Sequence, residues 1–135
     1  MVVSSLRYGN FSTTSLSFDA ALDRVRELLQ NEGFGVITEI DVAKTLKQKR
    51  DIDFRPYTIL GACNPDFALE ALKLEDQLGL LLPCNVVVTL RDGKTVISAV
   101  NPIAVLGVAD KPELSSIAKQ VDERLRRVLA AIALE

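Results

Sequence analysis

The sequence contains no histidine and no tryptophan, and only two of its 135 residues are cysteine. Histidine is the most common general base and the most common zinc ligand. Its absence excludes Ser-His and Cys-His hydrolases and zinc sites built on imidazole. Any catalysis would depend on carboxylates, thiols, lysine or tyrosine. The sequence contains no recognisable catalytic motif, and we predict neither a cofactor nor an assigned metal site.

The chain also lacks a strong net charge and long apolar runs. It has 16 basic and 18 acidic residues, which give a net charge of −2 and no overall attraction to nucleic acid. The longest apolar stretches, such as 78–83 and 86–90, are far shorter than the roughly 20 residues of a membrane helix. Residues 1–7 do not resemble a signal peptide. We therefore expect a cytoplasmic protein with reduced thiols that binds neither nucleic acid nor membrane.

What the chain does have is a composition typical of one ordered globular domain over residues 1–135. Hydrophobic residues make up 48 % of it and charged residues 25 %, well away from the composition of disordered chains. At this length about two-thirds of the unfolded chain's surface is buried on folding. One sizeable core is therefore expected.

Periodicity and turn signals predict five strands and four helices. The strands cover 2–8, ending at a Gly9-Asn10 turn, then 34–40, 57–63, 85–90 and 95–100, the last closed by Asn101-Pro102. Three helices follow N-caps at Ser17, Asp41 and Asn64 and end near Gly33, Arg50 and Gly79. The fourth, of about 23 residues and roughly 35 Å, follows a capping box at Asp110 and Glu113.

The clearest local signal is Asp92-Gly93 between two β-rich runs, which predicts a hairpin. With one hairpin and two long amphipathic helices, the simplest architecture is an antiparallel sheet covered on one face by the first and last helices. The predicted fold class is α+β, in two layers.

The two cysteines are candidate site residues. Cys63 ends a predicted strand directly before a helix N-cap, where a thiolate is favoured, and Cys84 begins the next strand. Because a single short helix connects them, we expect their Cα atoms within about 10 Å of one another. Such a pair could handle sulfur, sense redox changes or bind a soft metal. The alternative is that both are small buried hydrophobic residues, as free cysteines usually are.

Other polar residues are candidates for ligand binding. Arg55 and Tyr57 share one face of a predicted strand, and Gly61 on that face leaves room for a ligand. Asn64 and Asn101 each precede a proline at a strand end. The ordinary alternative for Arg55 and Tyr57 is a surface ion pair and a tyrosine at a sheet edge. The ligand-binding candidates are Arg55, Tyr57, Cys63, Asn64, Cys84 and Asn101, with Cys63 and Cys84 as candidate ligands of a soft metal.

The elements Cys63-Asn64-Pro65 and Leu82-Pro83-Cys84, with the segments 55–65 and 81–88 around them, resemble the domain-of-unknown-function family 302 over roughly residues 15–132. The resemblance implies a fold similar to the TATA-binding-protein-like β-α-β4-α class with extra helices. It also implies a homodimer, and it implies no established activity. A fold analogy does not by itself predict DNA binding.

These observations lead to two hypotheses of function. The first is a homodimeric module that binds a small ligand between the sheet and the last helix, or recruits a partner through an exposed strand edge. Apolar segments at 78–82 and 103–108 that flank the sheet support it. The second is a thiol-dependent redox, sulfur-handling or soft-metal-binding function of Cys63 and Cys84.

Overall fold

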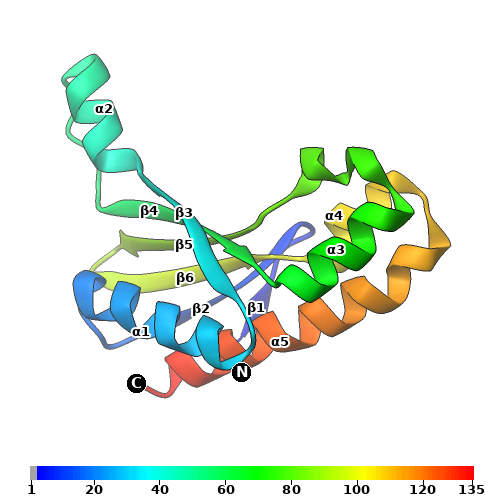
Figure 1. Cartoon of the computed structure of the whole chain (residues 1–135). Coiled ribbons are helices and arrows are strands. Elements are labelled where there is room, and N and C mark those ends of the chain that lie inside the picture. The colour runs from blue at the N-terminus through cyan, green and yellow to red at the C-terminus, as the bar shows by residue number, and fades with distance from the viewer. Residues whose placement is uncertain (1–2) are drawn as a thin grey trace.

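A computed structural model of the chain describes residues 3–135 and contains one antiparallel sheet in the order β1-β2-β6-β5-β4-β3 (Figure 1). The strands are β1 Ser4–Ser5, β2 Gly9–Thr14, β3 Gly35–Asp41, β4 Tyr57–Cys63, β5 Cys84–Arg91 and β6 Lys94–Val100. The α-helices are α1 Phe18–Asn31, α2 Val42–Arg50, α3 Pro65–Leu74, α4 Pro102–Leu106 and α5 Ser115–Ala133. Three 3₁₀ segments are η1 Asp76–Leu81, η2 Gly107–Ala109 and η3 Pro112–Leu114.

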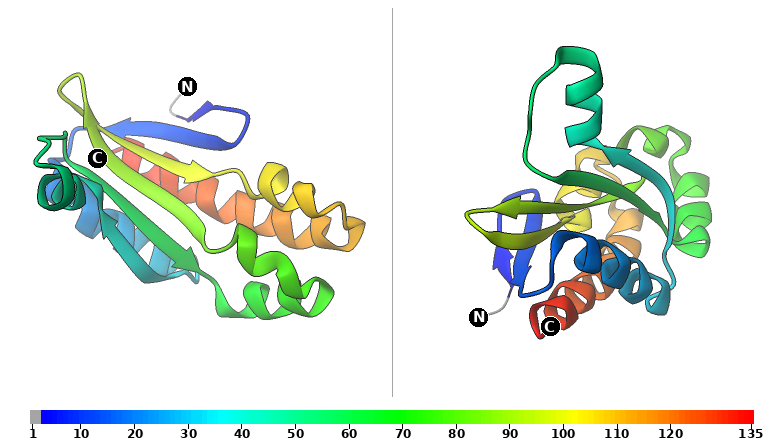
Figure 2. Two further views of the ribbon diagram at one scale, coloured as in Figure 1. Left: turned by 90° about the horizontal axis from the view of Figure 1, so that it is seen from above. Right: turned by 90° about the vertical axis from the view of Figure 1, so that its left-hand side faces the viewer.

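The two long helices α1 and α5 pack side by side against one face of the sheet (Figure 2). Leu125 and Ile132 of α5 are fully buried, as are Leu60, Val88 and Ile97 on the sheet. The predicted two-layer α+β fold is therefore confirmed. The order β2-α1-β3-β4-β5-β6-α5 is β-α-β4-α with α2, α3 and α4 inserted. In the part of the chain that the structure describes, no helix is long and apolar enough to cross a membrane.

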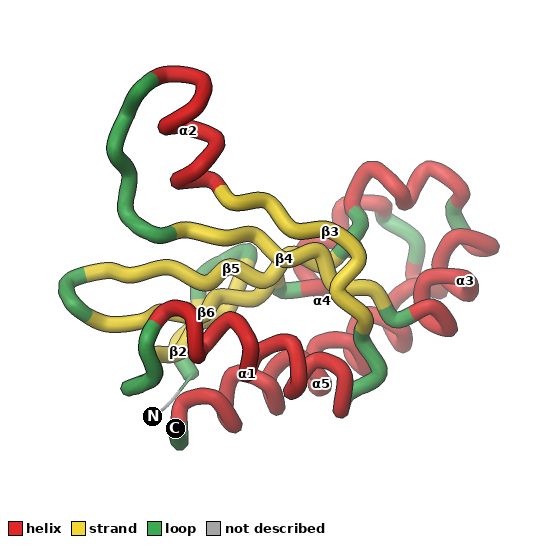
Figure 3. Tube along the Cα trace, turned by 60° about the vertical axis from the view of Figure 1, so that its left-hand side comes forward, coloured by secondary structure: helices red, strands yellow, loops and turns green. Residues whose placement is uncertain are grey.

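Helix α2 stands away from the body as an arm that continues β3 (Figure 3). Asp41 caps it as predicted, because its side chain accepts a hydrogen bond from the backbone N–H of Lys44. None of its nine residues, all within the described range, is buried. Its last turn is basic, where the helix dipole favours cations, and Lys47 pairs with Asp51 and Asp53.

The predicted hairpin joins β5 to β6. Its two turn residues, Asp92 and Gly93, have φ angles of 52° and 77°. Both are left-handed, as a type I′ turn requires, and Gly93 adopts that conformation without steric cost. Gly33 directly follows the C-cap of α1 with φ 85°, also as predicted.

The predicted first strand over 2–8 is wrong. Val2 lies outside the described residues, and only Ser4–Ser5 form a strand before the chain turns at 6–8. Gly9-Asn10 is not a turn but the start of β2, which pairs with β6 along its length. The polar sequence of β2 hid this strand, because its buried side chains form hydrogen bonds instead of apolar contacts. Ser12 donates to the backbone carbonyl of Leu129 at 2.8 Å.

The predicted capping box before the last helix is also wrong. Asp110 has a left-handed backbone and ends η2, and α5 begins at Ser115 after the separate turn η3. Helix α5 therefore has 19 residues, not about 23. Pro112 explains the break, since it supports a tight new turn but lacks the N–H of a continuous helix.

We predict that Gly61→Ala destabilises the protein by about 1–3 kcal/mol, the usual cost of overpacking. An added Cβ atom would meet the Thr38 hydroxyl and lie 2.9 Å from Cγ of the rigid Pro83 ring. Urea unfolding measures the change. Gly35→Ala is the control, because a Cβ atom there has no described heavy atom within 4 Å. Equal stability of the two variants would contradict the close packing over β4.

Candidate functional site

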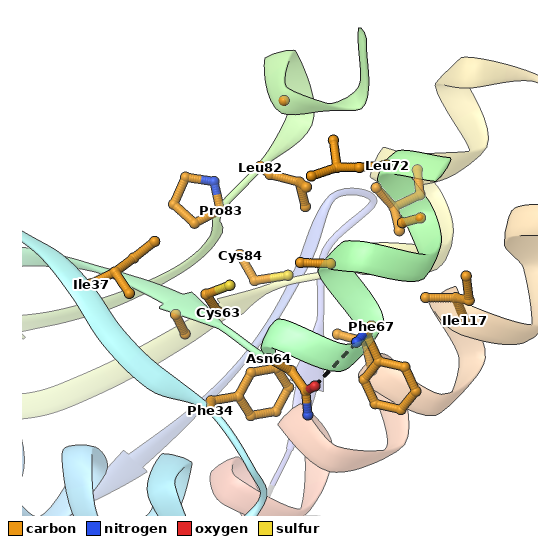
Figure 4. Close-up of a pocket in the computed structure, with 16 residues that line it drawn as sticks. Phe34, Ile37, Cys63, Asn64, Phe67, Leu72, Leu82, Pro83, Cys84 and Ile117 are labelled. Carbon is orange, nitrogen blue, oxygen red and sulfur yellow. Dashed lines mark hydrogen bonds between the residues drawn. The ribbon is translucent and has the colours of Figure 1, made fainter. Parts of the chain in front are cut away.

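A pocket of about 300 Å³ lies beyond the ends of β4 and β5, between these strands and helices α3 and α5 (Figure 4). Its walls come from segments far apart in the sequence. The sheet contributes Ala62, Cys63 and Cys84, and α5 contributes Ile117 and Val121. The remaining lining residues are Phe34, Ile37, Asn64, Phe67, Ala68, Ala71, Leu72, Gly79, Leu82, Pro83 and Leu106. Among the residues that the structure describes, no charged side chain lines the pocket.

Asn64 positions the wall formed by α3. Its side-chain Oδ1 accepts hydrogen bonds from the backbone N–H groups of Asp66 at 3.1 Å and Phe67 at 3.2 Å. Pro65 occupies the first helical position, where its missing N–H costs nothing. The Asn-Pro pair therefore starts the helix at the strand end and directs Phe67 and Ala71 into the pocket. Asn64 lines the pocket, but its polar oxygen is already used as a helix cap.

The two cysteines line the same pocket. Cys84 is paired with Ala62, the residue before Cys63. Strand spacing and rise then place the two cysteine Cα atoms about 6 Å apart. This agrees with the proximity expected from the sequence. Their side chains leave the sheet on opposite faces, but both sulfurs lie at the strand ends facing α3 (Figure 4).

Burial dominates the chemistry of Cys84. It raises the pKa of this thiol from 9.0 to about 11, and the neighbouring Cys63 adds to the effect. Desolvation disfavours the charged thiolate, so Cys84 is a neutral, weakly polar wall residue at physiological pH. Neither cysteine forms a disulfide. Among residues 3–135, no group of three or more Cys, Asp or Glu side chains lies close enough to hold a metal ion.

The other sequence candidates lie elsewhere. Arg55 precedes β4 and Tyr57 begins it, at the end opposite to Cys63. The Arg55 guanidinium lies 4.6 Å from the ring centre of Phe54 and 5.5 Å from that of Tyr57, and its Nε donates to Thr89. These contacts form a separate cluster. The predicted common face of Arg55 and Tyr57 therefore does not belong to the pocket.

Asn101 caps a helix that the sequence analysis missed. Its Oδ1 accepts from the N–H groups of Ile103 and Ala104, and Pro102 is the first residue of α4. The signal is the same Asn-Pro pair that predicts α3 at Asn64. Helix α4 adds Leu106 to the pocket wall. Asn101 thus shapes the wall without lining the pocket.

Two aromatic side chains line the pocket, and the sequence pattern did not predict them as site residues. Phe34 lies three residues after the last residue of α1, and Phe67 lies in the first turn of α3. The guanidinium of Arg124 lies 5.0 Å from the Phe67 ring centre and covers its outer side. Helical periodicity marks Phe67 as inward-facing, but it does not distinguish a pocket wall from a core.

We predict that the Cys84 thiol stays protonated to high pH. In Cys63→Ala, where Cys84 is the remaining thiol, thiolate absorbance near 240 nm should rise only well above pH 9. Subtracting the spectrum of the double variant Cys63→Ala/Cys84→Ala removes the absorbance of every group other than the Cys84 thiolate. Denaturant should return the transition to the ordinary value of 9.0, because unfolding removes the burial that raises the pKa. A native transition near pH 7 would contradict this assignment and favour a reactive thiol.

The raised pKa of Cys84 also makes the free energy of unfolding depend on pH. The folded pKa lies above the unfolded value, so this contribution is fully present below about pH 9 and is lost as the pH rises towards 11. Its size is at most about 3 kcal/mol. The difference in unfolding free energy between the wild type and Cys84→Ala should therefore shrink across this range.

Comparison with known proteins agrees with the resemblance noted in the sequence. The family model described as "Domain of unknown function DUF302" matches residues 11–132. The crystal structure of an uncharacterized conserved protein DUF302 from Bacillus stearothermophilus is similar, with 32 % identity and a TM-score of 0.86. That match covers 92 % of this chain and 97 % of the other. A comparison with curated proteins finds no match. The predicted family is confirmed, and the chain belongs to the DUF302 family.

Proposed function

We propose that the protein binds a small, uncharged, largely apolar molecule in the pocket between β4, β5, α3 and α5. The observation that carries this proposal is the lining, which is apolar except for two thiols and one amide. A volume of about 300 Å³ is at the lower end of the range for small-molecule sites. A compact ligand is therefore favoured over a long chain.

The electrostatics of the pocket narrow the ligand class. A charged group in this site would lose its hydration without gaining a partner, which costs several kcal/mol. The aromatic rings of Phe34 and Phe67 offer flat surfaces for a ring or a short branched chain. The neutral thiol of Cys84 offers a weak S–H donor. A neutral ring compound with at most one polar atom fits these walls.

We predict that filling the pocket abolishes binding of a neutral fluorescent probe. The probe is N-phenyl-1-naphthylamine, titrated against the wild type and Ala68→Phe. Ala68 lines the pocket, and the added ring would occupy much of its volume, so the affinity should fall at least tenfold. Leu69→Phe is the matched control, since Leu69 is the next residue on α3 and is 57 % exposed.

If Ala68→Phe is folded by circular dichroism and binds the probe with wild-type affinity, the pocket is not the binding site. The same conclusion follows if Leu69→Phe loses as much probe affinity as Ala68→Phe. If Ala68→Phe does not fold, Ala68→Leu provides the same test with a smaller side chain. Absence of probe binding by the wild type also counts against the proposal.

A thiol-dependent function is the alternative, and the common pocket of Cys63 and Cys84 favours it. Sulfur transfer, redox sensing and soft-metal binding all use the thiolate form. Burial opposes that form at Cys84, whose pKa is raised to about 11. Thiolate titration of both single variants, Cys63→Ala for Cys84 and Cys84→Ala for Cys63, therefore separates this alternative from the apolar-ligand proposal.

We also propose that the protein acts as a homodimer without a nucleic-acid partner. Several large apolar side chains are exposed on the monomer, among them Tyr8, Ile37 and Ile40. Large exposed apolar patches usually mark interaction sites. The net charge of −2 gives no general attraction to a phosphate backbone.

We predict twice the monomer mass by light scattering coupled to size exclusion at micromolar concentration. Apolar burial drives the association, so high salt should not dissociate the dimer. A monomer mass at 100 µM would contradict the homodimer. Binding of N-phenyl-1-naphthylamine is measured separately, and its outcome does not depend on this mass.

A further inference from the structure

We infer that two copies of the chain associate through the face of the sheet opposite α1 and α5. This inference rests on the proposed homodimer and assigns its surface. We call this surface the open face, because no helix packs flat against it in the part of the chain that the structure describes (Figure 2). The α2 arm rises beside it, and Pro83, in the segment that leads into β5, packs over Gly61 near the pocket end of the face.

The strand register places one apolar row across the middle of the open face. Phe11 of β2 is opposite Ser98 of β6, and Ser98 is opposite Val87 of β5. Val87 is opposite Ile59 of β4, which is opposite Ile40 of β3. Residues directly opposite in a sheet share a face, so the five side chains form one continuous line.

These side chains remain accessible in the monomer. Ile40 is 49 % exposed, and the other four are only partly buried. The neighbouring rows of the open face contain Thr13, Val96 and Asn85, which are also uncharged. Three cations share this face. Arg91 and Lys94 lie at its hairpin end, and Arg55 lies beside them, where its guanidinium contacts Tyr57 and Thr89 in the row next to Val87.

The row is suited to a second copy because it can pair with itself. A two-fold axis at Val87, the middle of the row, brings Phe11 against Ile40 of the partner subunit and Ser98 against Ile59 of the partner subunit. Such an isologous contact uses the same surface on both copies. Since the centre carries no charge, closing it leaves no buried unpaired ion.

The size of the open face reaches the minimum for a biological interface. Five strands at about 4.8 Å spacing and about six residues at about 3.4 Å rise give roughly 500 Å² on each copy. Two copies then bury about 1,000 Å², which is near the lower limit for a biological interface. Sheets stacked in this way lie about 10 Å apart.

The α2 arm supplies further contact area. The arm continues β3 beyond the Ile40 end of the row (Figure 1). The two-fold axis would therefore bring it to the β1–β2 edge of the partner subunit. Leu6 and Tyr8 are both exposed at that edge. The arm contacts the start of β4 in its own chain but has no buried residue among those described, so it has surface left for a second copy.

The test is Val87→Arg, measured by light scattering from 1 to 200 µM. Two arginines at the two-fold axis would face each other without counter-charges, so the dimer dissociation constant should rise at least 100-fold and the monomer should dominate. Leu80→Arg is the matched control. Leu80 is 82 % exposed on η1, away from the open face, and its variant should remain dimeric.

The possible results distinguish the proposed homodimer from the proposed interface. A monomeric wild type would contradict both the homodimer and the interface. A folded Val87→Arg variant that stays dimeric would contradict only the assignment of the open face as the interface. If Val87→Arg does not fold, Val87→Cys gives a second test by cross-linking with a thiol-specific bismaleimide, because sheets about 10 Å apart are too distant for a direct disulfide. Val87→Cys should form a covalent dimer that the wild type does not form, and failure to cross-link would overturn the assignment of the axis.

Discussion

The packing of α1 and α5 against one face of the sheet is the constraint on which the rest of the structure depends. Leu60, Val88 and Ile97 are fully buried on that face, and α5 spans it with Leu125 and Ile132. Both long amphipathic helices are used on one side, so the opposite face is left with side chains of intermediate exposure. An uncovered antiparallel face is usually polar, but here a largely apolar row crosses it.

The pocket is a consequence of where α3 begins. Asn64 and Pro65 start this helix directly at the end of β4, so it leaves the sheet and packs towards α5 beyond the strand ends. The space between them is closed by η1 and the segment that returns to β5. Glu75 caps η1 and pairs with Lys111, which explains the acidic residue at that helix end. The walls therefore depend on two short polar caps, while the interior stays apolar.

The sequence predicts the elements whose signals are local. The Asp41 and Asn64 caps, the Asp92-Gly93 turn and the amphipathic periodicity of the long helices depend on residues within one or two turns of each other, and the structure confirms them. Strand β2 was misplaced because its polar residues find partners more than 100 positions away, as Ser12 does at Leu129. Arg55 does not lie near the thiols. The alternation of side chains along a strand predicts which face of the sheet a residue is on, but not how far apart two residues on that face lie.

The pocket and the open face are physically continuous through β3 and β4. Ile37 lines the pocket, is 62 % exposed, and lies at the irregular register of β3, three residues from Ile40. Cys63 follows Ile59 on the same alternation of β4 and reaches the pocket at the strand end. A ligand in the proposed pocket and a second copy on the proposed interface would therefore contact the same two strands, β3 and β4, at different positions along them.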